Sequence, residues 1–201
     1  MKLKPFMVLL ALILTLVQCK NSGKTDPCNY DKFLKDPSTP AIAKELYNNT
    51  YKLQSDDPLS LLEYLESEED DKRTFYFRVI TNMKKIADGA VAEGLGGTGK
   101  EYIEKNTKEF ASYFDEKNCF TDQDLSTWAD IVMLEFSLLA ENEFDKALVE
   151  DYNKQLLQNC KDCSASQQAT LAKFTKLLES NWNAYLKSID NPVENQQQPQ
   201  E

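Results

Sequence analysis

Four cysteines beyond residue 20 are the side chains of this chain best suited to covalent chemistry: Cys28, Cys119, Cys160 and Cys163. In an oxidising compartment an even set of cysteines pairs into two disulfides, for which three connectivities exist. Cys160 and Cys163 have the C-x-x-C spacing of thioredoxin-like redox pairs, but no βαβ pattern accompanies them. Zinc would need four thiolates converging from three distant segments. We therefore expect structural disulfides first, thiol–disulfide exchange second and zinc last.

A glycine-rich segment, Gly94-Leu95-Gly96-Gly97-Thr98-Gly99-Lys100, contains the G-x-x-x-x-G-K part of a phosphate-binding P-loop. Glu101 stands where a P-loop has the Ser or Thr that holds magnesium. The preceding residues also have a helical pattern rather than that of a buried strand. We interpret the glycines as an interhelical loop with no nucleotide role and expect no cofactor.

A second partial motif, Asp122-Gln123-Asp124-Leu125-Ser126, resembles the opening of an EF-hand calcium loop. Thr127 replaces the required glycine, and Met133 stands where the bidentate glutamate belongs. We interpret the segment as a helix N-terminus whose acids are favourably placed against the helix dipole, and expect no metal.

The chain has no histidine, which restricts the kinds of catalytic site it can form. This excludes Ser-His-Asp and Cys-His nucleophiles, zinc sites that use histidine and the Glu-x-x-His helices of di-iron bundles. Carboxylate pairs such as Glu135 with Glu141 or Glu143 are more typical of a solvated helix face. We therefore assign no catalytic residue and expect the protein not to be an enzyme.

The first 18 residues have the organisation of a secretory signal peptide. Lys2 and Lys4 form a short basic region, and the run from Phe6 to Val17 carries no charge. The run is shorter than the roughly 20 apolar residues that a spanning helix needs. Polar residues follow it from Lys20 onwards. We expect residues 1–18 to be removed on export.

The sequence Leu16-Val17-Gln18-Cys19 resembles the lipobox of bacterial lipoproteins. The resemblance implies cleavage before Cys19 and lipidation of that cysteine, so that acyl chains hold the protein to a membrane of the bacterial cell envelope. Lys20 after the cysteine resembles the pattern of enterobacterial lipoproteins of the outer membrane. Gln18 departs from the small residue usual in the family. The alternative is cleavage after Cys19, which releases a soluble secreted protein.

The charge balance argues against nucleic acid as a partner. The whole chain has a formal net charge of −10 at pH 7. Removing residues 1–18 takes away two lysines and no acids, leaving 21 basic and 33 acidic residues. No basic cluster follows the signal, whereas binding to a phosphate backbone depends on clustered Lys and Arg. The acidic stretch from Glu66 to Asp71 is interpreted as a solvated loop.

Apolar residues recur at helical spacing through nearly all of the remaining chain, which predicts an all-α fold. We expect a tether and irregular lead-in over 19–37, a helical domain over 38–190 and a disordered polar tail over 191–201. The domain is predicted to be an irregular, disulfide-stapled bundle of six to seven helices. Their expected ranges are 40–53, a short helix after Pro58, 72–93, 99–115, one from Thr121, 143–159 and one from Ser164.

Thr121 with Asp124 and Ser164 with Gln167 resemble capping boxes, which predicts where the helices from Thr121 and Ser164 begin. The helix from Thr121, which contains Trp128, is apolar on nearly every side, so we expect it to be central.

The expected topology also predicts how the cysteines pair. In an up-and-down bundle, loops separated by an even number of helices lie at the same end. This places Cys28 and Cys119 at the same end as Cys160 and Cys163. We expect Cys119 to bond to one member of the Cys160/Cys163 couple and Cys28 to the other.

These observations together predict an exported, lipid-anchored envelope protein with a non-enzymatic binding or structural role. One alternative is a soluble secreted protein that binds a ligand or partner in the bundle interior, where Trp128, Phe136 and Trp182 would line a pocket. The other is a thiol–disulfide exchange protein that uses Cys160 and Cys163.

Overall fold

The computed structural model describes residues 28–52, 57–115, 119–142 and 147–190, and every regular element in this part of the chain is helical. The all-α prediction is therefore confirmed. The elements are α1 (Asp31–Lys35), α2 (Ala41–Tyr47), η1 (Pro58–Glu66), α3 (Asp70–Met83), η2 (Lys84–Ile86), α4 (Gly89–Lys105), α5 (Thr107–Asp115), α6 (Asp122–Asn142), α7 (Leu148–Asn159) and α8 (Ala165–Asp190). Residues 1–27 and 191–201 lie outside these ranges, so the predicted signal peptide, the first part of the tether and the predicted tail are not described. The end of the predicted irregular lead-in is described and contains α1, so it is not wholly irregular.

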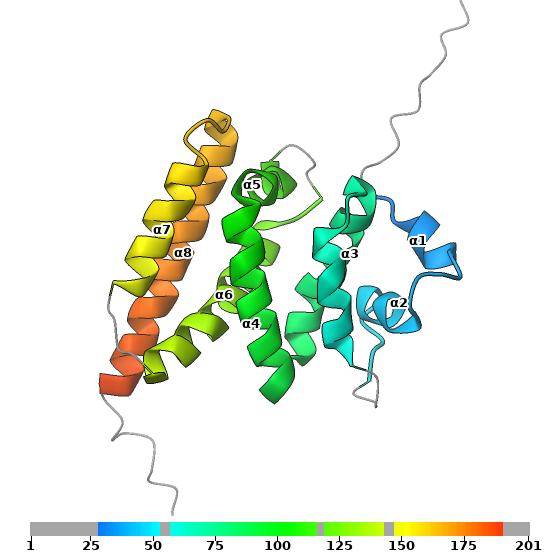
Figure 1. Cartoon of the computed structure of the whole chain (residues 1–201), viewed down its shortest axis with the longest axis horizontal. Coiled ribbons are helices and arrows are strands. Elements are labelled where there is room, and N and C mark those ends of the chain that lie inside the picture. The colour runs from blue at the N-terminus through cyan, green and yellow to red at the C-terminus, as the bar shows by residue number, and fades with distance from the viewer. Residues whose placement is uncertain (1–27, 53–56, 116–118, 143–146, 191–201) are drawn as a thin grey trace, which may run out of the picture.

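The helix predicted to begin near Thr121 is the centre of the fold. It is α6, which packs against α3, α4 and α8. Trp128 of α6 is fully buried, stacks on Phe77 of α3 with 4.2 Å between ring centroids and donates from Nε1 to Thr81 Oγ1 at 2.8 Å. Small helices α1 and α2 lie at one side of the molecule, and the antiparallel pair α7 and α8 lies at the other (Figure 1).

Two predicted capping boxes are confirmed. Thr121 N donates to Asp124 Oδ2 at 2.8 Å, and Asp124 N donates back to Thr121 Oγ1 at 3.2 Å. Ser164 N and Gln167 Oε1 form the same kind of pair at 2.9 Å, with Gln167 N bonded to Ser164 Oγ at 3.2 Å. These side chains satisfy N–H groups that a helix start leaves unpaired, which fixes where α6 and α8 begin.

The predicted loop over the glycine-rich segment is wrong, because those glycines lie inside α4. The chain instead breaks earlier, where η2 leads into Gly89, whose φ is +39°. Glycine at the later positions allows α4 to approach α6. A Cβ added at Gly99 would lie 2.5 Å from Ile131 Cγ2, and one at Gly96 would lie 2.8 Å from the backbone nitrogen of Glu135. Close packing against α6 therefore outweighs the low helix propensity of glycine.

The expected disulfide pairing is also wrong. Cys28 bonds to Cys119 and Cys160 bonds to Cys163, with Cα–Cα distances of 5.3 and 5.0 Å. Loops at the same end of a bundle can lie beside different helices, so sharing an end does not bring their cysteines together. Arg78 of α3 donates to the Cys119 carbonyl oxygen at 2.6 Å, which holds Cys119 beside α3. Cys160 and Cys163 belong instead to the turn between α7 and α8.

Candidate functional site

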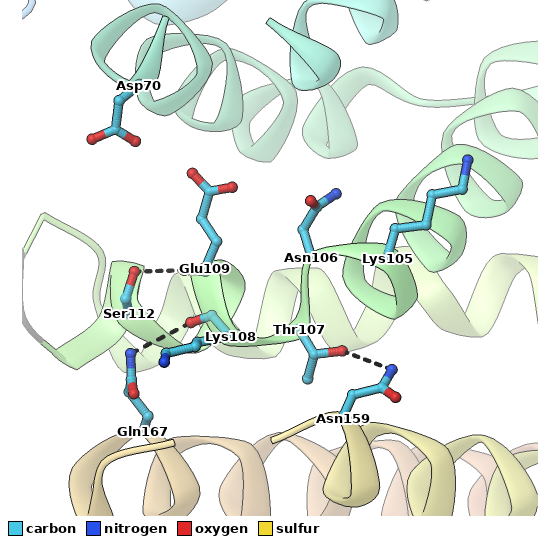
Figure 2. Close-up of a pocket in the computed structure, with 9 residues that line it drawn as sticks. All are labelled: Asp70, Lys105, Asn106, Thr107, Lys108, Glu109, Ser112, Asn159 and Gln167. Carbon is cyan, nitrogen blue, oxygen red and sulfur yellow. Dashed lines mark hydrogen bonds between the residues drawn. The ribbon is translucent and has the colours of Figure 1, made fainter. Parts of the chain in front are cut away.

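A polar cleft of about 770 Å³ lies where α4 meets α5, facing the start of α3 and the turn between α7 and α8 (Figure 2). The lining side chains are almost all charged or amide-bearing. They are Asp70, Lys105, Asn106, Thr107, Lys108, Glu109, Ser112, Asn159 and Gln167. A cleft with this lining can hydrogen-bond a polar ligand or a polypeptide segment.

The floor of the cleft is shaped by a helix break that sequence reasoning missed. We expected one helix over 99–115, whereas α4 ends at Lys105 and α5 begins at Thr107. Thr107 is buried, and its Oγ1 donates to the Ile103 carbonyl oxygen at 2.8 Å. Asn159 Nδ2 donates to the Glu104 carbonyl oxygen at 3.0 Å. The adjacent Asn106 and Thr107 were the available signal, because both types have low helix propensity.

The wall formed by α8 is fixed by the capping box at its start. Gln167 is only 3% exposed. Its Oε1 accepts from Ser164 N at 2.9 Å, and its Nε2 donates to the Lys108 carbonyl oxygen at 3.5 Å. The Gln167 side chain therefore caps α8 and also bonds it to α5. The capping box that starts the helix thus positions this side of the cleft as well.

Glu109 is the less exposed of the two acidic side chains that line the cleft, and it has two hydrogen-bond donors. Glu109 Oε1 accepts from Arg73 Nε at 2.7 Å and from the Tyr113 hydroxyl at 2.9 Å. Burial opposes the charge on Arg73, but hydrogen bonding and attraction by Glu109 prevail and raise its pKa above the usual value. Arg73 also pairs with Asp70 at 3.1 Å. Arg73 is therefore shared between the two carboxylates, and Glu109 is held in the network by both Arg73 and Tyr113.

Two tyrosines continue this network into the core. The Tyr102 hydroxyl donates to the Tyr113 hydroxyl at 3.2 Å. Burial raises the pKa of both tyrosines above the ordinary value, and the negative charge of Glu109 adds to the effect. Both hydroxyls therefore remain protonated at neutral pH, and the network joins α3, α4 and α5 behind the cleft.

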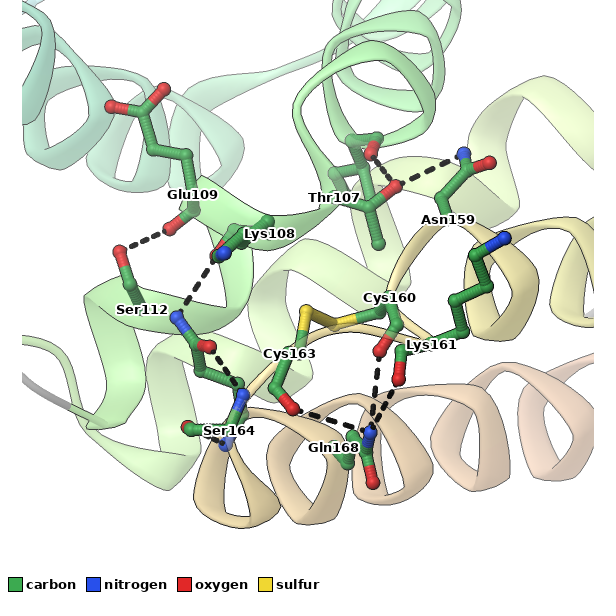
Figure 3. The surroundings of a disulfide bond; sticks show 12 residues. Thr107, Lys108, Glu109, Ser112, Asn159, Cys160, Lys161, Cys163, Ser164 and Gln168 are labelled. Carbon is green, nitrogen blue, oxygen red and sulfur yellow. Dashed lines mark hydrogen bonds between the residues drawn. A yellow bond between two sulfur atoms is a disulfide. The ribbon is translucent and has the colours of Figure 1, made fainter.

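The Cys160–Cys163 disulfide lies beside this cleft, with Thr107, Lys108 and Asn159 among its surroundings (Figure 3). Cys160 is 1% exposed, whereas Cys163 is partly exposed and comes immediately before Ser164, the cap of α8. Nε2 of Gln168 donates to the carbonyl oxygens of Cys160, Lys161 and Cys163 at 3.5, 3.1 and 3.3 Å. The structure thus brings the C-x-x-C pair together and places it next to a polar surface.

The other disulfide lies in a different environment. Cys28 and Cys119 are 91 residues apart in sequence. Arg78 supports the Cys119 segment, because it bonds to the Cys119 carbonyl oxygen, pairs with Asp124 Oδ1 at 2.7 Å and lies 4.2 Å from the centre of the Phe120 ring. The disulfide therefore joins Cys28 to a segment that Arg78 of α3 holds in place just before the start of α6.

The remaining sequence motifs do not form sites. Lys100 of the P-loop-like segment lies in α4, pairs with Glu104 at 3.4 Å and sits 5.2 Å from the centre of the Tyr152 ring. The backbone there is helical, so it does not form the loop that would surround a phosphate. The EF-hand-like segment is the first turn of α6, as expected. Trp128, Phe136 and Trp182 are each at most 4% exposed and belong to the core.

The described ranges contain neither a metal-binding cluster nor a helix suited to cross a membrane. No group of three or more Cys, Asp or Glu side chains there is arranged to hold a metal ion. None of the described helices has both the length and the apolar character needed to cross a bilayer. Cys19, the predicted lipidation site, and Glu143 of the carboxylate pairs lie outside these ranges.

No protein family, curated protein or solved structure matches this sequence or fold.

Proposed function

We propose that this protein is an exported bacterial lipoprotein, anchored to the cell envelope through Cys19, whose helical domain has a non-enzymatic binding role. The observation that carries the proposal is the pairing of all four later cysteines with one another. Because the chain has five cysteines, this pairing leaves Cys19 without a disulfide partner in its own chain. A cysteine in a lipobox-like sequence that is not needed for a disulfide is suited to lipidation.

Two internal disulfides also support export. Disulfides persist in the periplasm and outside the cell, whereas cytosolic reductants keep thiols reduced. The bond from Cys28 begins only nine residues after Cys19, which limits the tether to about 30 Å even when fully extended. The helical domain would therefore be held close to the membrane surface, and the residue after the anchor, Lys20, favours the outer membrane.

The polar cleft is the best candidate for the binding role. Its lining can form hydrogen bonds with a polar ligand, while Glu109 is held by Arg73 and Tyr113. The interior pocket of the secreted alternative is less well supported, because Trp128, Phe136 and Trp182 are buried in the core. The secreted alternative differs from the proposal only in the processing at Cys19, since cleavage would follow this residue instead of preceding it and no acyl chain would be attached.

Replacement of the anchor residue tests the proposal. In Cys19→Ser, acylation cannot occur, and we expect the protein to leave the membrane fraction in cells of a bacterium with the lipoprotein pathway. Each buried acyl CH₂ contributes about 0.8 kcal/mol to membrane binding, so loss of two chains abolishes stable retention. Gln18→Gly is the matched control, since it improves the resemblance to a lipobox and should keep the protein in the membrane. Equal retention of wild type and Cys19→Ser would contradict the anchor.

A further inference from the structure

The two residues of the Cys160–Cys163 pair differ in their exposure to solvent. Cys160 is 1% exposed and packs into the hydrophobic core, whereas Cys163 is partly exposed at the surface. Thiol–disulfide exchange proceeds by attack of a thiolate on one sulfur and passes through a mixed disulfide. An incoming thiolate therefore reaches Cys163, and Cys160 is the sulfur displaced.

The position of Cys163 also stabilises the charge that exchange creates. Cys163 comes immediately before the cap of α8, a helix of 26 residues. The N-terminus of a helix carries a partial positive charge, which favours a nearby thiolate. A thiolate that is stabilised in this way is also a better leaving group from a mixed disulfide.

Backbone and side-chain hydrogen bonds hold the turn in addition to the disulfide. Cys160 N donates to the Leu156 carbonyl oxygen at 3.1 Å, and Cys163 N donates to the Cys160 carbonyl oxygen at 3.1 Å. The three bonds from Gln168 add to this support (Figure 3). The two sulfurs therefore stay close together when the bond between them opens, which allows it to re-form. Cys28 and Cys119 come from distant segments and lack such a shared turn.

We propose that Cys160 and Cys163 form a redox-active pair that exchanges its disulfide with the dithiol of a cysteine-containing polypeptide in the envelope. This departs from the wholly non-enzymatic role proposed above, because it adds redox chemistry at the turn between α7 and α8, while the binding role proposed for the cleft is unchanged. The polar cleft lies beside the pair, since its lining residues Thr107, Lys108 and Asn159 surround the disulfide, and it offers hydrogen-bonding groups to such a polypeptide (Figure 3).

The exchange balances in two steps. A thiolate of the polypeptide forms a bond to Cys163 Sγ, and the Cys160–Cys163 bond breaks with its electron pair going to Cys160, which takes a proton from solvent. The second thiolate of the polypeptide then attacks its own sulfur in the mixed disulfide, and Cys163 leaves as a thiolate. The polypeptide dithiol is oxidised to a disulfide, and the Cys160–Cys163 disulfide is reduced to a dithiol. A disulfide of another exported protein reverses the process.

The test uses the exported chain with Cys19→Ser, so that only the four paired cysteines remain. The probe is a synthetic peptide with two reduced cysteines, and the readout is the rate of peptide disulfide formation at pH 7. We expect this protein to oxidise the peptide at least tenfold faster than the same chain with Cys160→Ala and Cys163→Ala, which retains Cys28–Cys119. Circular dichroism and thermal melting verify that the compared proteins are folded. Equal rates would overturn the proposal.

Single substitutions provide a matched pair that does not depend on the double variant. With Cys160→Ala the partly exposed Cys163 remains as a thiol, and the probe is the oxidised peptide with its two cysteines joined in a disulfide. We expect the Cys163 thiolate to attack that disulfide and form a mixed disulfide with the peptide, whose second sulfur leaves as a thiolate, and the adduct is trapped by acid. With Cys163→Ala only the buried Cys160 remains, and we expect at least tenfold less adduct. Peptide mapping by mass spectrometry locates the bond. An adduct mainly on Cys28, Cys119 or Cys160 would overturn the proposal and leave the disulfide a purely structural role.

Discussion

Cys28 is bonded to Cys119, and the carbonyl oxygen of Cys119 accepts a hydrogen bond of 2.6 Å from Arg78. The residue nearest the proposed tether is thus joined covalently to a segment that α3 holds in place. A pull on the tether would be transmitted to the central helices rather than peeling α1 from the domain. The two disulfides therefore differ in what they join: Cys28–Cys119 links segments 91 residues apart, whereas Cys160–Cys163 lies within one turn.

This difference predicts unequal losses of stability. Chain-entropy estimates give about 4.5 kcal/mol for closing a loop the size of that between Cys28 and Cys119, but only about 2 kcal/mol for the short loop between Cys160 and Cys163. Urea unfolding of the two double alanine variants measures both values. We expect the variant without Cys28–Cys119 to be clearly the less stable. A larger loss on removing Cys160–Cys163 would contradict this order.

Close contact between α4 and α6 predicts opposite outcomes at two neighbouring glycines. In Gly99→Ala the new Cβ would lie 2.5 Å from Ile131 Cγ2 in the core, so overpacking should reduce the free energy of unfolding by about 1–3 kcal/mol. In Gly97→Ala the nearest atom is Glu135 Oε2 at 3.3 Å, the mobile end of a side chain. This control should be neutral or gain up to about 1 kcal/mol from helix propensity.

Thermal and urea unfolding of both variants verify the glycine prediction. Similar losses in the two variants would show that helix packing does not explain the glycines. A stabilised Gly99→Ala would show that the helices are farther apart than the structure places them.

The fold should lose stability at alkaline pH. Burial raises the pKa of Tyr102 and Tyr113 in the folded state, so folding favours their protonated form. Their contribution is complete below about pH 10, the ordinary tyrosine pKa, and is lost as pH rises through the raised values. We expect the free energy of unfolding to decrease above pH 10, by up to about 1.4 kcal/mol per pH unit for each group.

Tyr102→Phe is the control for this pH dependence, because it removes one titrating hydroxyl and keeps the ring. The substitution also removes the hydrogen bond of 3.2 Å that the Tyr102 hydroxyl donates to the Tyr113 hydroxyl, so we expect a small loss of stability at pH 7. Urea melts at several values of pH should give a shallower decrease for Tyr102→Phe than for wild type. The same slope in both proteins would rule out Tyr102 as a source of the effect.

Short-range signals in the sequence predicted local structure well. The capping boxes at Thr121 and Ser164 were predicted because their hydrogen bonds join residues three positions apart. The all-α class and the central place of Trp128 followed from periodicity and from an apolar run too broad for a surface helix.

Features that depend on lateral packing could not be predicted. The helical conformation at Gly96 and Gly99 requires α6 beside them, which no local propensity reveals. The disulfide pairing depends on Cys119 lying next to α3 rather than near the turn that contains Cys160. The cleft was missed because it forms at the break after Lys105, where segments distant in sequence meet.

The most direct test of the proposed anchor is the mass of the intact protein purified from both the membranes and the culture medium of a bacterium that expresses it. We expect a membrane-bound chain that begins at Cys19, carries two or three acyl chains on that residue and contains two disulfides. Peptide mapping should give Cys28 with Cys119 and Cys160 with Cys163. A protein that begins at Lys20 without acyl chains, or one that keeps residues 1–18, would contradict the lipoprotein assignment.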